Sequence, residues 1–260
     1  MKVVILCGGF GTRIRDVADN IPKPMIPVGD KPILWHIMKY YSSFGFNEFV
    51  LCLGYKSNVI KDFFVNYEIN TSDFTLQLGQ KSAIRFMNVH DEKDWKITFA
   101  ETGENAMTGA RIKKIKKYIP QGEQFLLTYG DGLSDVDLNN LISFHNKNNN
   151  VMTLTAVRPP GRFGEIMSDE KGKITEFNEK PQATGGRING GFFVCNYKMF
   201  DYIEEGDHVV FEQDPIRNMV KDGQLMQYNH DGFWQPMDTY REYSLLNEIY
   251  TKNKAPWKKW

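Results

Sequence analysis

Short apolar runs alternate with amphipathic segments along the first half of the chain. The apolar runs are typical of buried strands and lie at Val3–Leu6, Glu48–Leu53, Gln124–Tyr129 and Val151–Val157. Helical spacing of apolar residues predicts a helix opened by Lys31-Pro32 and stopped at Gly45, and further helices over Ser57–Val65, Arg111–Tyr118 and Leu138–Asn148. Strands that alternate with helices indicate an α/β fold: a Rossmann-like, mainly parallel mixed sheet flanked by helices.

Residues 66–100 break this alternation. Phe74–Leu78 alternates with period two and Trp95–Phe99 is also strand-like, which predicts a small antiparallel excursion between them. We expect this excursion to serve subunit contact. The second half is more mixed, and its patterns predict strands at Lys173–Phe177 and Gly191–Cys195 and helices at Asp214–Lys221 and Thr239–Lys252. No repeat or linker divides the chain, so we expect one domain over residues 1–260.

Composition narrows the classes of partner and compartment. The 32 basic and 32 acidic side chains cancel, whereas proteins that bind nucleic acid or anionic membranes usually carry a basic excess. We therefore expect no nucleic acid and no membrane as partner. The three cysteines form no C-x-x-C pair, which favours reduced, buried thiols over a disulfide framework or a zinc site. No signal peptide or membrane-spanning run is evident, and we expect a cytoplasmic protein.

The strongest chemical signal is a glycine-rich turn after the first strand, Leu6-Cys7-Gly8-Gly9-Phe10-Gly11-Thr12-Arg13. Glycines let backbone N–H groups approach phosphate oxygens, and Thr12 and Arg13 add a hydroxyl and a bidentate cation. The spacing fits neither a dinucleotide fingerprint nor a P-loop, because Ile14 stands where the third glycine would be and no Gly-Lys-Ser/Thr follows. The alternative is a tight turn that binds no ligand.

Three charged residues further along the chain are candidates for the same site. Lys23 lies between Pro22 and Pro24, which restrict the loop, so we interpret it as a phosphate clamp rather than a solvated surface lysine. Asp131 follows the strand Gln124–Tyr129 directly, where a carboxylate faces the ligand crevice of an open α/β sheet; a plain turn aspartate is the alternative. Asp238 precedes the last predicted helix and is either a ligand or its N-cap.

The glycine-rich turn together with Lys23-Pro24-Met25 resembles the signature of the sugar nucleotidyltransferases, the nucleotide-sugar pyrophosphorylases. The resemblance covers nearly the whole chain. Later segments are similar to the branch formed by the glucose-1-phosphate cytidylyltransferases, namely Leu34–Met38, Thr128–Gly132, Pro159–Gly164, Asn189–Phe193 and Gly232–Thr239.

This resemblance implies roles for particular residues. It implies Lys23, Arg13 and Asp131 as the catalytic residues, and Asp131 and Asp238 as the ligands of one Mg²⁺. It implies contacts with the sugar hydroxyls and the sugar phosphate at Gly164, Glu179, Lys180 and Asn189. The expected nucleotide-binding residues are Leu6, Cys7, Gly8, Gly9, Gly11, Thr12, Arg13, Lys23, Thr102, Thr108, Gly109, Arg111 and Gly130.

We expect base recognition in the loop around Glu101–Gly103 and Met107–Arg111. Cytosine differs from uracil in its 4-amino donor and its acceptor nitrogen at position 3, so discrimination needs a protein acceptor near one and a donor near the other. Backbone groups of the loop can supply both, and Arg111 is our candidate for a side-chain donor; the alternative is a solvated helix residue.

The reaction implied is transfer of a cytidylyl group from CTP to glucose 1-phosphate with Mg²⁺, in a homo-oligomer. The phosphate nucleophile is already an anion, so the expected catalysis is positioning and charge neutralisation without a general base. Two alternatives remain: UTP or dTTP as the nucleotide, and a non-catalytic, nucleotide-sensing relative. The presence of Arg13, Lys23, Asp131 and Asp238 favours an enzyme over the second alternative.

Overall fold

A seven-stranded mixed sheet forms the centre of this computed structural model, which describes residues 1–11, 14, 21–79, 84–88, 90–159, 165–168, 173–178 and 186–260. The strand order is β14-β10-β13-β8-β1-β4-β7. Only β13 runs antiparallel to its neighbours, and the other pairs of this sheet are parallel. The strands are β1 (Lys2–Leu6), β4 (Glu48–Leu53), β7 (Lys96–Glu101), β8 (Gln124–Tyr129), β10 (Met152–Val157), β13 (Ile188–Asn196) and β14 (Leu225–His230).

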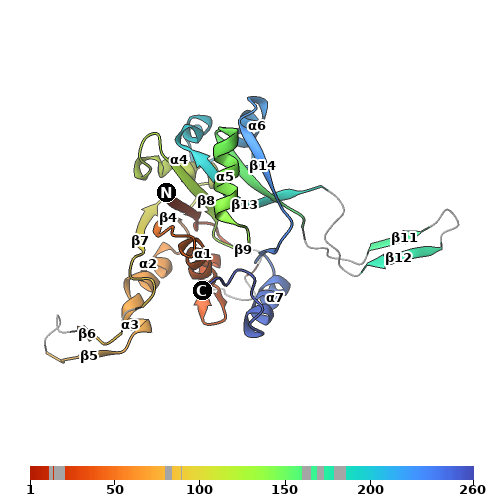
Figure 1. The fold of residues 1–260 in the computed structure, drawn as a ribbon. Coiled ribbons are helices and arrows are strands. Elements are labelled where there is room, and N and C mark those ends of the chain that lie inside the picture. The colour runs from red at the N-terminus through yellow and green to blue at the C-terminus, as the bar shows by residue number, and fades with distance from the viewer. Residues whose placement is uncertain are drawn as a thin grey trace.

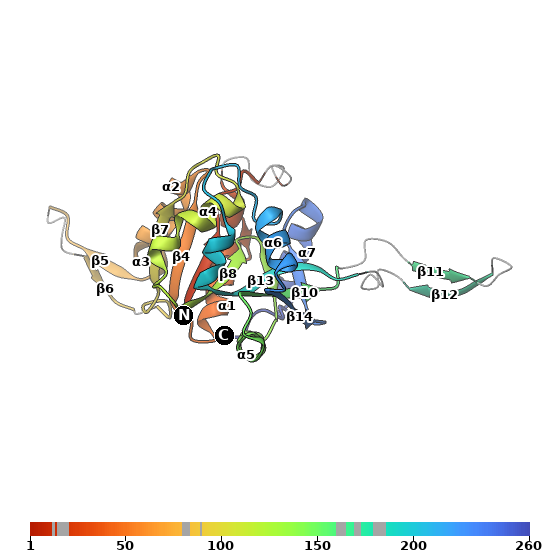
Figure 2. The ribbon, with the colours of Figure 1, turned by 90° about the horizontal axis from the view of Figure 1, so that it is seen from above.

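Helices cover both faces of the sheet (Figures 1 and 2). Buried residues of four helices pack into the core on one face, and these helices are α1 (Ile33–Ser42), α2 (Ser57–Val65), α5 (Leu138–Asn148) and α7 (Tyr240–Thr251). The core on the other face is completed by α4 (Thr108–Lys114), η3 (Lys116–Tyr118), η4 (Tyr197–Tyr202) and α6 (Asp214–Lys221). A short helix, α3 (Tyr67–Thr71), follows α2.

The two cores explain why the central strands read as continuous apolar runs. In β1, Val3 and Ile5 enter one core, whereas Val4 and Leu6 enter the other. Successive side chains of a strand point to opposite faces, so a strand covered on both faces needs apolar residues at every position.

Two antiparallel hairpins extend from the body in opposite directions (Figures 1 and 2). One consists of β5 (Phe74–Leu76) and β6 (Ile84–Phe86), and the other of β11 (Glu165–Ser168) and β12 (Ile174–Asn178). Two smaller ladders join β2 (Pro27–Val28) to β3 (Lys31–Pro32) and β9 (Gly132–Ser134) to β15 (Trp234–Pro236). Lys23–Met25 forms the short 3-10 helix η2. None of the described helices has the length and apolarity to cross a membrane.

Most of the predicted elements are confirmed, and the predicted antiparallel excursion contains the β5–β6 hairpin. Its strand-like end, Trp95–Phe99, instead joins the parallel sheet as β7. The helix predicted from Lys31-Pro32 begins at Ile33, because Lys31 and Pro32 pair with Val28 and Pro27. The helix predicted over Arg111–Tyr118 begins three residues earlier, at Thr108, and is interrupted at Ile115.

The parallel strands bring four chain segments to one edge of the sheet. The carboxyl ends of β8, β1, β4 and β7 lie next to one another, and short backbone bonds continue the ladder beyond them: Gly130 N donates to Leu6 O, Tyr55 N to Gly8 O, and Thr102 N to Leu53 O. Ligands of open α/β sheets bind at this edge. The glycine-rich turn, Gly54, Thr102 and Gly130 are therefore neighbours in space.

Candidate active site

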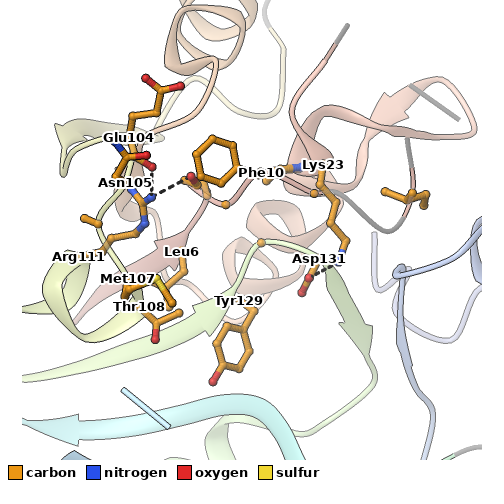
Figure 3. Close-up of a pocket in the computed structure, with 18 of the residues that line it drawn as sticks. Leu6, Phe10, Lys23, Glu104, Asn105, Met107, Thr108, Arg111, Tyr129 and Asp131 are labelled. Atoms are coloured by element: carbon orange, nitrogen blue, oxygen red, sulfur yellow. Dashed lines mark hydrogen bonds and ion pairs between the residues drawn. The ribbon is translucent and has the colours of Figure 1, made fainter. Parts of the chain in front are cut away.

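A cavity of about 500 Å³ opens at this edge of the sheet (Figure 3). Its lining combines the glycine-rich turn, the loop before α4 and the end of β8. The lining residues are Leu6, Cys7, Gly8, Gly9, Phe10, Gly11, Ile14, Lys23, Pro24, Glu104, Asn105, Ala106, Met107, Thr108, Arg111, Tyr129, Gly130, Asp131 and Asp238. Figure 3 shows Lys23 and Asp131 on one side, and Arg111, Glu104 and Asn105 on the other, with Leu6 and Tyr129 between them. We call these sides the acidic end and the loop end.

At the acidic end, one ammonium group contacts two carboxylates. The Lys23 Nζ atom lies 2.6 Å from Asp131 Oδ2 and 2.5 Å from Asp238 Oδ1. Burial acts to lower the pKa of Lys23, but the charges and hydrogen bonds of the two carboxylates outweigh it and raise the pKa above its ordinary value. Lys23 is therefore held as a cation between two anions.

Long-range backbone pairing brings these two carboxylates together. Asp131 follows β8, and the ladder between β9 and β15 pairs Gly132 with Pro236. Met237 N then donates to Asp131 O at 2.8 Å, which places the next residue, Asp238, beside Asp131. Asp238 is not the N-cap of α7, because Thr239 caps that helix in a capping box with Glu242.

Glycine at position 11 has a local structural reason. Its φ is +61°, and a Cβ built there would lie 2.9 Å from Lys23 Cβ. Glycine therefore permits both the left-handed backbone and the close approach of the turn to Lys23. The chain around Lys23 is fixed by Pro22 and by the η2 turn, in which Ile26 N donates to Lys23 O.

The two carboxylates fit a divalent cation. They converge on one point already occupied by positive charge, and Mg²⁺ binds typically through one or two carboxylates with phosphate oxygens and water as further ligands. Among the described residues there is no group of three or more His, Cys, Asp or Glu side chains that could hold a metal alone. A metal here would thus need ligands from a bound polyphosphate or from water.

A chain of hydrogen bonds connects the middle of the cavity to the segment before α6. Glu212 accepts hydrogen bonds from Thr108 Oγ1 at 2.7 Å and from the Tyr129 hydroxyl at 2.5 Å. Asn189 Nδ2 donates to the same tyrosine oxygen at 3.3 Å. Burial and the nearby Glu212 carboxylate raise the pKa of Tyr129, so its hydroxyl remains protonated. Tyr129 therefore links the cavity to Asn189, a predicted sugar-binding residue.

The structure brings together most of the predicted nucleotide-binding residues that it describes. Three predicted residues lie outside the lining. Thr102 is buried and bonds to Leu53 O, Gly109 packs against Val209 without room for a Cβ, and Asn189 reaches the cavity only through Tyr129. The predictions for Thr12, Arg13, Gly164, Glu179 and Lys180 lie outside the described residues.

Sequence reasoning missed several residues of the lining and its support. Glu104, Asn105 and Ala106 fill the gap between the two segments expected to recognise the base, and their position between those segments was a usable signal. Gly54 directly follows β4, and Gly8 comes shortly after the end of β1. A glycine after each of these two strands was a second usable signal. Nothing in the local sequence singles out Glu212.

The cysteines are confirmed as buried free thiols. Cys7 lies in the cavity wall, where burial raises its pKa well above the ordinary value and its Sγ bonds to Ile5 O. Burial likewise raises the pKa of Cys52 to about 12. Protonated, buried thiols are poor nucleophiles, so we do not expect a cysteine to act as a nucleophile in this site.

The model of the nucleotidyl transferase family matches residues 2–253. The chain belongs to the nucleotidyl transferase family. It is 45% identical over 262 residues to a protein of Salmonella typhi named "Glucose-1-phosphate cytidylyltransferase", with 100% of each chain covered. It is 44% identical over 260 residues to a Bacillus subtilis (strain 168) protein named "Probable glucose-1-phosphate cytidylyltransferase", again with 100% of each covered.

Family membership agrees with the fold of a solved relative. The crystal structure of HddC from Yersinia pseudotuberculosis is similar with a TM-score of 0.70 and 25% identity, and the match covers 96% of this chain and 99% of that chain. The predicted Rossmann-like α/β fold and the predicted resemblance to sugar nucleotidyltransferases are confirmed.

Proposed function

We propose that this protein transfers the cytidylyl group of CTP to α-D-glucose 1-phosphate and so forms CDP-glucose and pyrophosphate. The observation that supports this proposal most strongly is that Lys23, Asp131 and Asp238 converge beside the glycine-rich turn. Charged groups arranged in this way suit the transfer of a phosphorylated group. Support for CTP and glucose 1-phosphate comes from full-length relatives that carry the name glucose-1-phosphate cytidylyltransferase.

In the proposed reaction, a phosphate oxygen of glucose 1-phosphate attacks the α-phosphorus of CTP. A new phosphorus–oxygen bond forms on the α-phosphorus, and the bond between that phosphorus and the α–β bridging oxygen breaks. Pyrophosphate leaves with the electron pair. The attacking oxygen is an anion near neutral pH, so no proton has to be removed, and the barrier lies in bringing two polyanions into line.

The chain's own groups lower that barrier by orientation and charge. Gly9 and Gly11 line the cavity, and their N–H groups have no protein acceptor among the described residues, so we assign these N–H groups to triphosphate oxygens. Lys23 supplies a cation at the acidic end. Arg13, the last residue of the glycine-rich turn in sequence, is its proposed companion on the triphosphate.

Asp131 and Asp238 are the proposed holders of Mg²⁺. When bound, the metal ion neutralises charge on the phosphate oxygens. The two carboxylates already share one cation, Lys23 Nζ, and binding of Mg²⁺ between them requires that ammonium group to move away. Lys23 would then be available to the phosphates.

The remaining assignments concern the base, the ribose and the sugar. We propose that the base and ribose lie between the glycine-rich turn and the loop at residues 102–111. Sugar binding is assigned to Asn189 and to three residues outside the described part of the chain, which are Gly164, Glu179 and Lys180. The hydrogen bond that the Asn189 amide donates to the Tyr129 hydroxyl in the cavity wall supports this assignment.

We also propose a homo-oligomer with the β5–β6 hairpin as a contact surface. The hairpin extends away from the body and exposes a group of large apolar side chains, namely Phe74, Leu76, Leu78, Ile84 and Met87. Exposed apolar groups of this kind mark interaction surfaces. Light scattering on the purified chain, compared with a Leu78→Asp variant, tests this proposal: a smaller particle is expected for the variant, and a monomeric wild type contradicts it.

A nucleotide competition assay tests the reaction. The purified protein is supplied with glucose 1-phosphate, Mg²⁺ and CTP, UTP, dTTP or GTP in turn, and pyrophosphate release is followed. We expect CTP to give the highest kcat/KM and the product to be CDP-glucose. If UTP or dTTP is preferred, the proposed reaction stands with a different nucleotide substrate. If none of the four nucleotides releases pyrophosphate, the proposed activity is wrong and the protein is a non-catalytic nucleotide-binding protein.

A further inference from the structure

The Glu212 carboxylate bonds to two hydroxyl groups in the wall of the cavity, although Glu212 is not itself among the lining residues. Its Oε1 accepts a hydrogen bond from the Tyr129 hydroxyl at 2.5 Å, and its Oε2 accepts one from Thr108 Oγ1 at 2.7 Å. Thr108 and Tyr129 come from α4 and β8 and lie next to each other in Figure 3. One carboxylate thus joins the start of α4 to the end of β8.

These contacts fix the direction of both hydroxyl hydrogens. A carboxylate ion only accepts hydrogen bonds, so each hydroxyl donates to Glu212. The Thr108 oxygen in turn accepts from Phe211 N at 2.9 Å, and the Tyr129 oxygen accepts from Asn189 Nδ2 at 3.3 Å. The Tyr129 hydroxyl is therefore an acceptor on the side of Asn189, because its hydrogen is already given to Glu212.

The Asn189 amide is held at both of its polar atoms. Its Oδ1 accepts from Gly191 N at 2.9 Å, whereas its Nδ2 gives one of two hydrogens to Tyr129. The second N–H of Nδ2 has no protein acceptor in the part of the chain that the structure describes. The two bonds that the amide makes set the direction of this remaining N–H, which can donate to a hydroxyl oxygen of a ligand.

A bulge in β13 brings Asn189 and Tyr129 together. Strand β10 pairs Leu154 with Phe193 and Ala156 with Asn189, so β13 has extra residues between these two pairs. Gly191 lies within the bulge with φ of +78°, and a Cβ there would lie 2.5 Å from Tyr129 Cδ2. Bulges redirect side chains, and glycine permits both this backbone and the close approach of the ring. The backbone is thus shaped for this pair of side chains.

We propose that Glu212 is a positioning residue for the sugar, which acts through the Tyr129 hydroxyl to orient the Asn189 amide toward a hydroxyl oxygen of the bound hexose. Without the carboxylate, the Tyr129 hydrogen is free to turn toward Asn189, where it would meet the N–H of Nδ2. The amide would then lose its partner and its fixed direction. The inference rests on the proposed function, in which Asn189 contacts the sugar.

Three possible roles of Glu212 differ in what its loss would do. If Glu212 only stabilised the fold, the binding of nucleotide with and without a sugar would weaken alike. If it contacted the sugar directly, its loss would have the same effect with or without the Tyr129 hydroxyl. Action through Tyr129 predicts that the contribution of the sugar to binding falls, and that this fall disappears once the hydroxyl is absent.

A double-mutant cycle with Glu212→Ala and Tyr129→Phe tests this route. Alanine removes the carboxylate, and phenylalanine keeps the ring but removes the hydroxyl that joins Glu212 to Asn189. Matched controls lie away from the cavity. They are Glu205→Ala, which removes an exposed carboxylate, and Tyr202→Phe, which removes a hydroxyl that likewise donates to a carboxylate.

The measurement is calorimetric affinity for CDP-glucose and for CDP, which differ only in the glucosyl group, with a thermal melt of each variant. We expect Glu212→Ala to lower the CDP-glucose-to-CDP affinity ratio about fivefold or more. The KM for glucose 1-phosphate should rise by a similar factor while the KM for CTP stays unchanged. Tyr129→Phe should lower the ratio as much, the double variant should lower it no further, and both controls should keep the wild-type ratio.

The proposal is overturned by equal weakening of both ligands, by an unchanged ratio, or by a double variant whose loss is the product of the two single losses. If Glu212→Ala does not melt cooperatively, Tyr129→Phe alone decides by the same ratio. A wild type that forms CDP-glucose, with variants that keep its affinity ratio, refutes only the role of Glu212. A wild type that forms no CDP-glucose and binds it no more tightly than CDP refutes the proposed function and this inference with it.

Discussion

Lys23 Nζ and Asp238 Oδ1 lie 2.5 Å apart although 215 positions separate the two residues in the sequence. The same ammonium group contacts Asp131, so one lysine balances one of the two negative charges of the carboxylates proposed to hold Mg²⁺. Under the proposed function, Mg²⁺ and Lys23 would therefore compete for the same oxygens, and a bound triphosphate would supply further oxygens for both cations.

Replacement of Lys23 by alanine should reduce turnover far more than stability. The variant loses a cation that faces the transferred phosphate, and we expect kcat/KM for CTP to fall about hundredfold or more. The unfolding free energy should change by less than about 1 kcal/mol, since both carboxylates are about a third exposed and solvent screens the pair. Steady-state kinetics and urea unfolding test this, with Lys252→Ala as the surface control. A Lys23→Ala protein that melts early yet keeps full activity per folded molecule would contradict the assignment.

Asp131→Asn and Asp238→Asn should weaken the response to metal. Each amide removes one negative ligand, and the Mg²⁺ concentration for half-maximal rate should rise about tenfold or more. A Mg²⁺ titration of pyrophosphate release at saturating CTP measures this shift, and the exposed Asp214→Asn serves as the control. Either variant that reaches the wild-type rate at the wild-type Mg²⁺ concentration is not missing a metal ligand.

Glu242 should affect both the stability of α7 and the metal response. Its Oε2 accepts hydrogen bonds from Asp238 N at 2.7 Å and from Thr239 N at 2.9 Å. Glu242→Ala removes this capping interaction, so we expect a loss of about 1 kcal/mol in unfolding free energy. We also expect a higher Mg²⁺ requirement, because Asp238 is less well held. Glu242→Gln keeps an acceptor, so it should restore most of the unfolding free energy and most of the wild-type Mg²⁺ response. Glu248→Ala, in the same helix, should alter neither the Mg²⁺ requirement nor the cap. A normal Mg²⁺ response in Glu242→Ala would show that the cap does not position Asp238.

His36 should make the fold less stable in mild acid. The ring is buried, its Nε2–H donates to Val28 O at 2.7 Å, and its Nδ1 accepts from Trp257 Nε1. Burial lowers the pKa of His36 from 6.5 to about 4, because a second ring proton would meet the indole N–H and find no water. The unfolded chain thus binds the proton first, and stability is lost as pH falls from about 6.5 towards 4.

The expected loss from His36 is about 2 kcal/mol between pH 7 and pH 5. Urea unfolding at these two pH values measures it. In His36→Gln, whose amide can still donate to Val28 O but does not titrate, the difference between the two pH values should shrink by about that amount. A pH dependence equal to that of the wild type would assign the effect to other groups.

The sequence predicted the sheet and most helices because their signals are local. Glu48–Leu53, Ser57–Val65 and Leu138–Asn148 carry complete apolar patterns, and their bounds in the structure are those predicted. Helix α4 starts earlier than predicted because of distant partners: Met107 N and Ala110 N donate to the carbonyls of Asp207 and Val209. No pattern within residues 107–111 contains that information.

The candidate site was only partly predictable for the same reason. Asp131 was evident from its place after a strand, but the partnership with Asp238 came from the family resemblance and not from spacing. The β9–β15 ladder that joins the two segments is three residues long on each side and has no distinct pattern. Likewise, Arg111 looked like a donor for a ligand, and only the structure reveals that its partners are carbonyls of three separate segments.

The most direct measurement is a crystal structure of the protein with CTP and Mg²⁺. The account predicts triphosphate oxygens on the N–H groups of the glycine-rich turn, the metal ion between Asp131 and Asp238 with Lys23 moved to the phosphates, and the cytosine ring against Glu104 and Asn105. Triphosphate bound away from the glycine-rich turn, with Lys23 still between the two carboxylates, would contradict it.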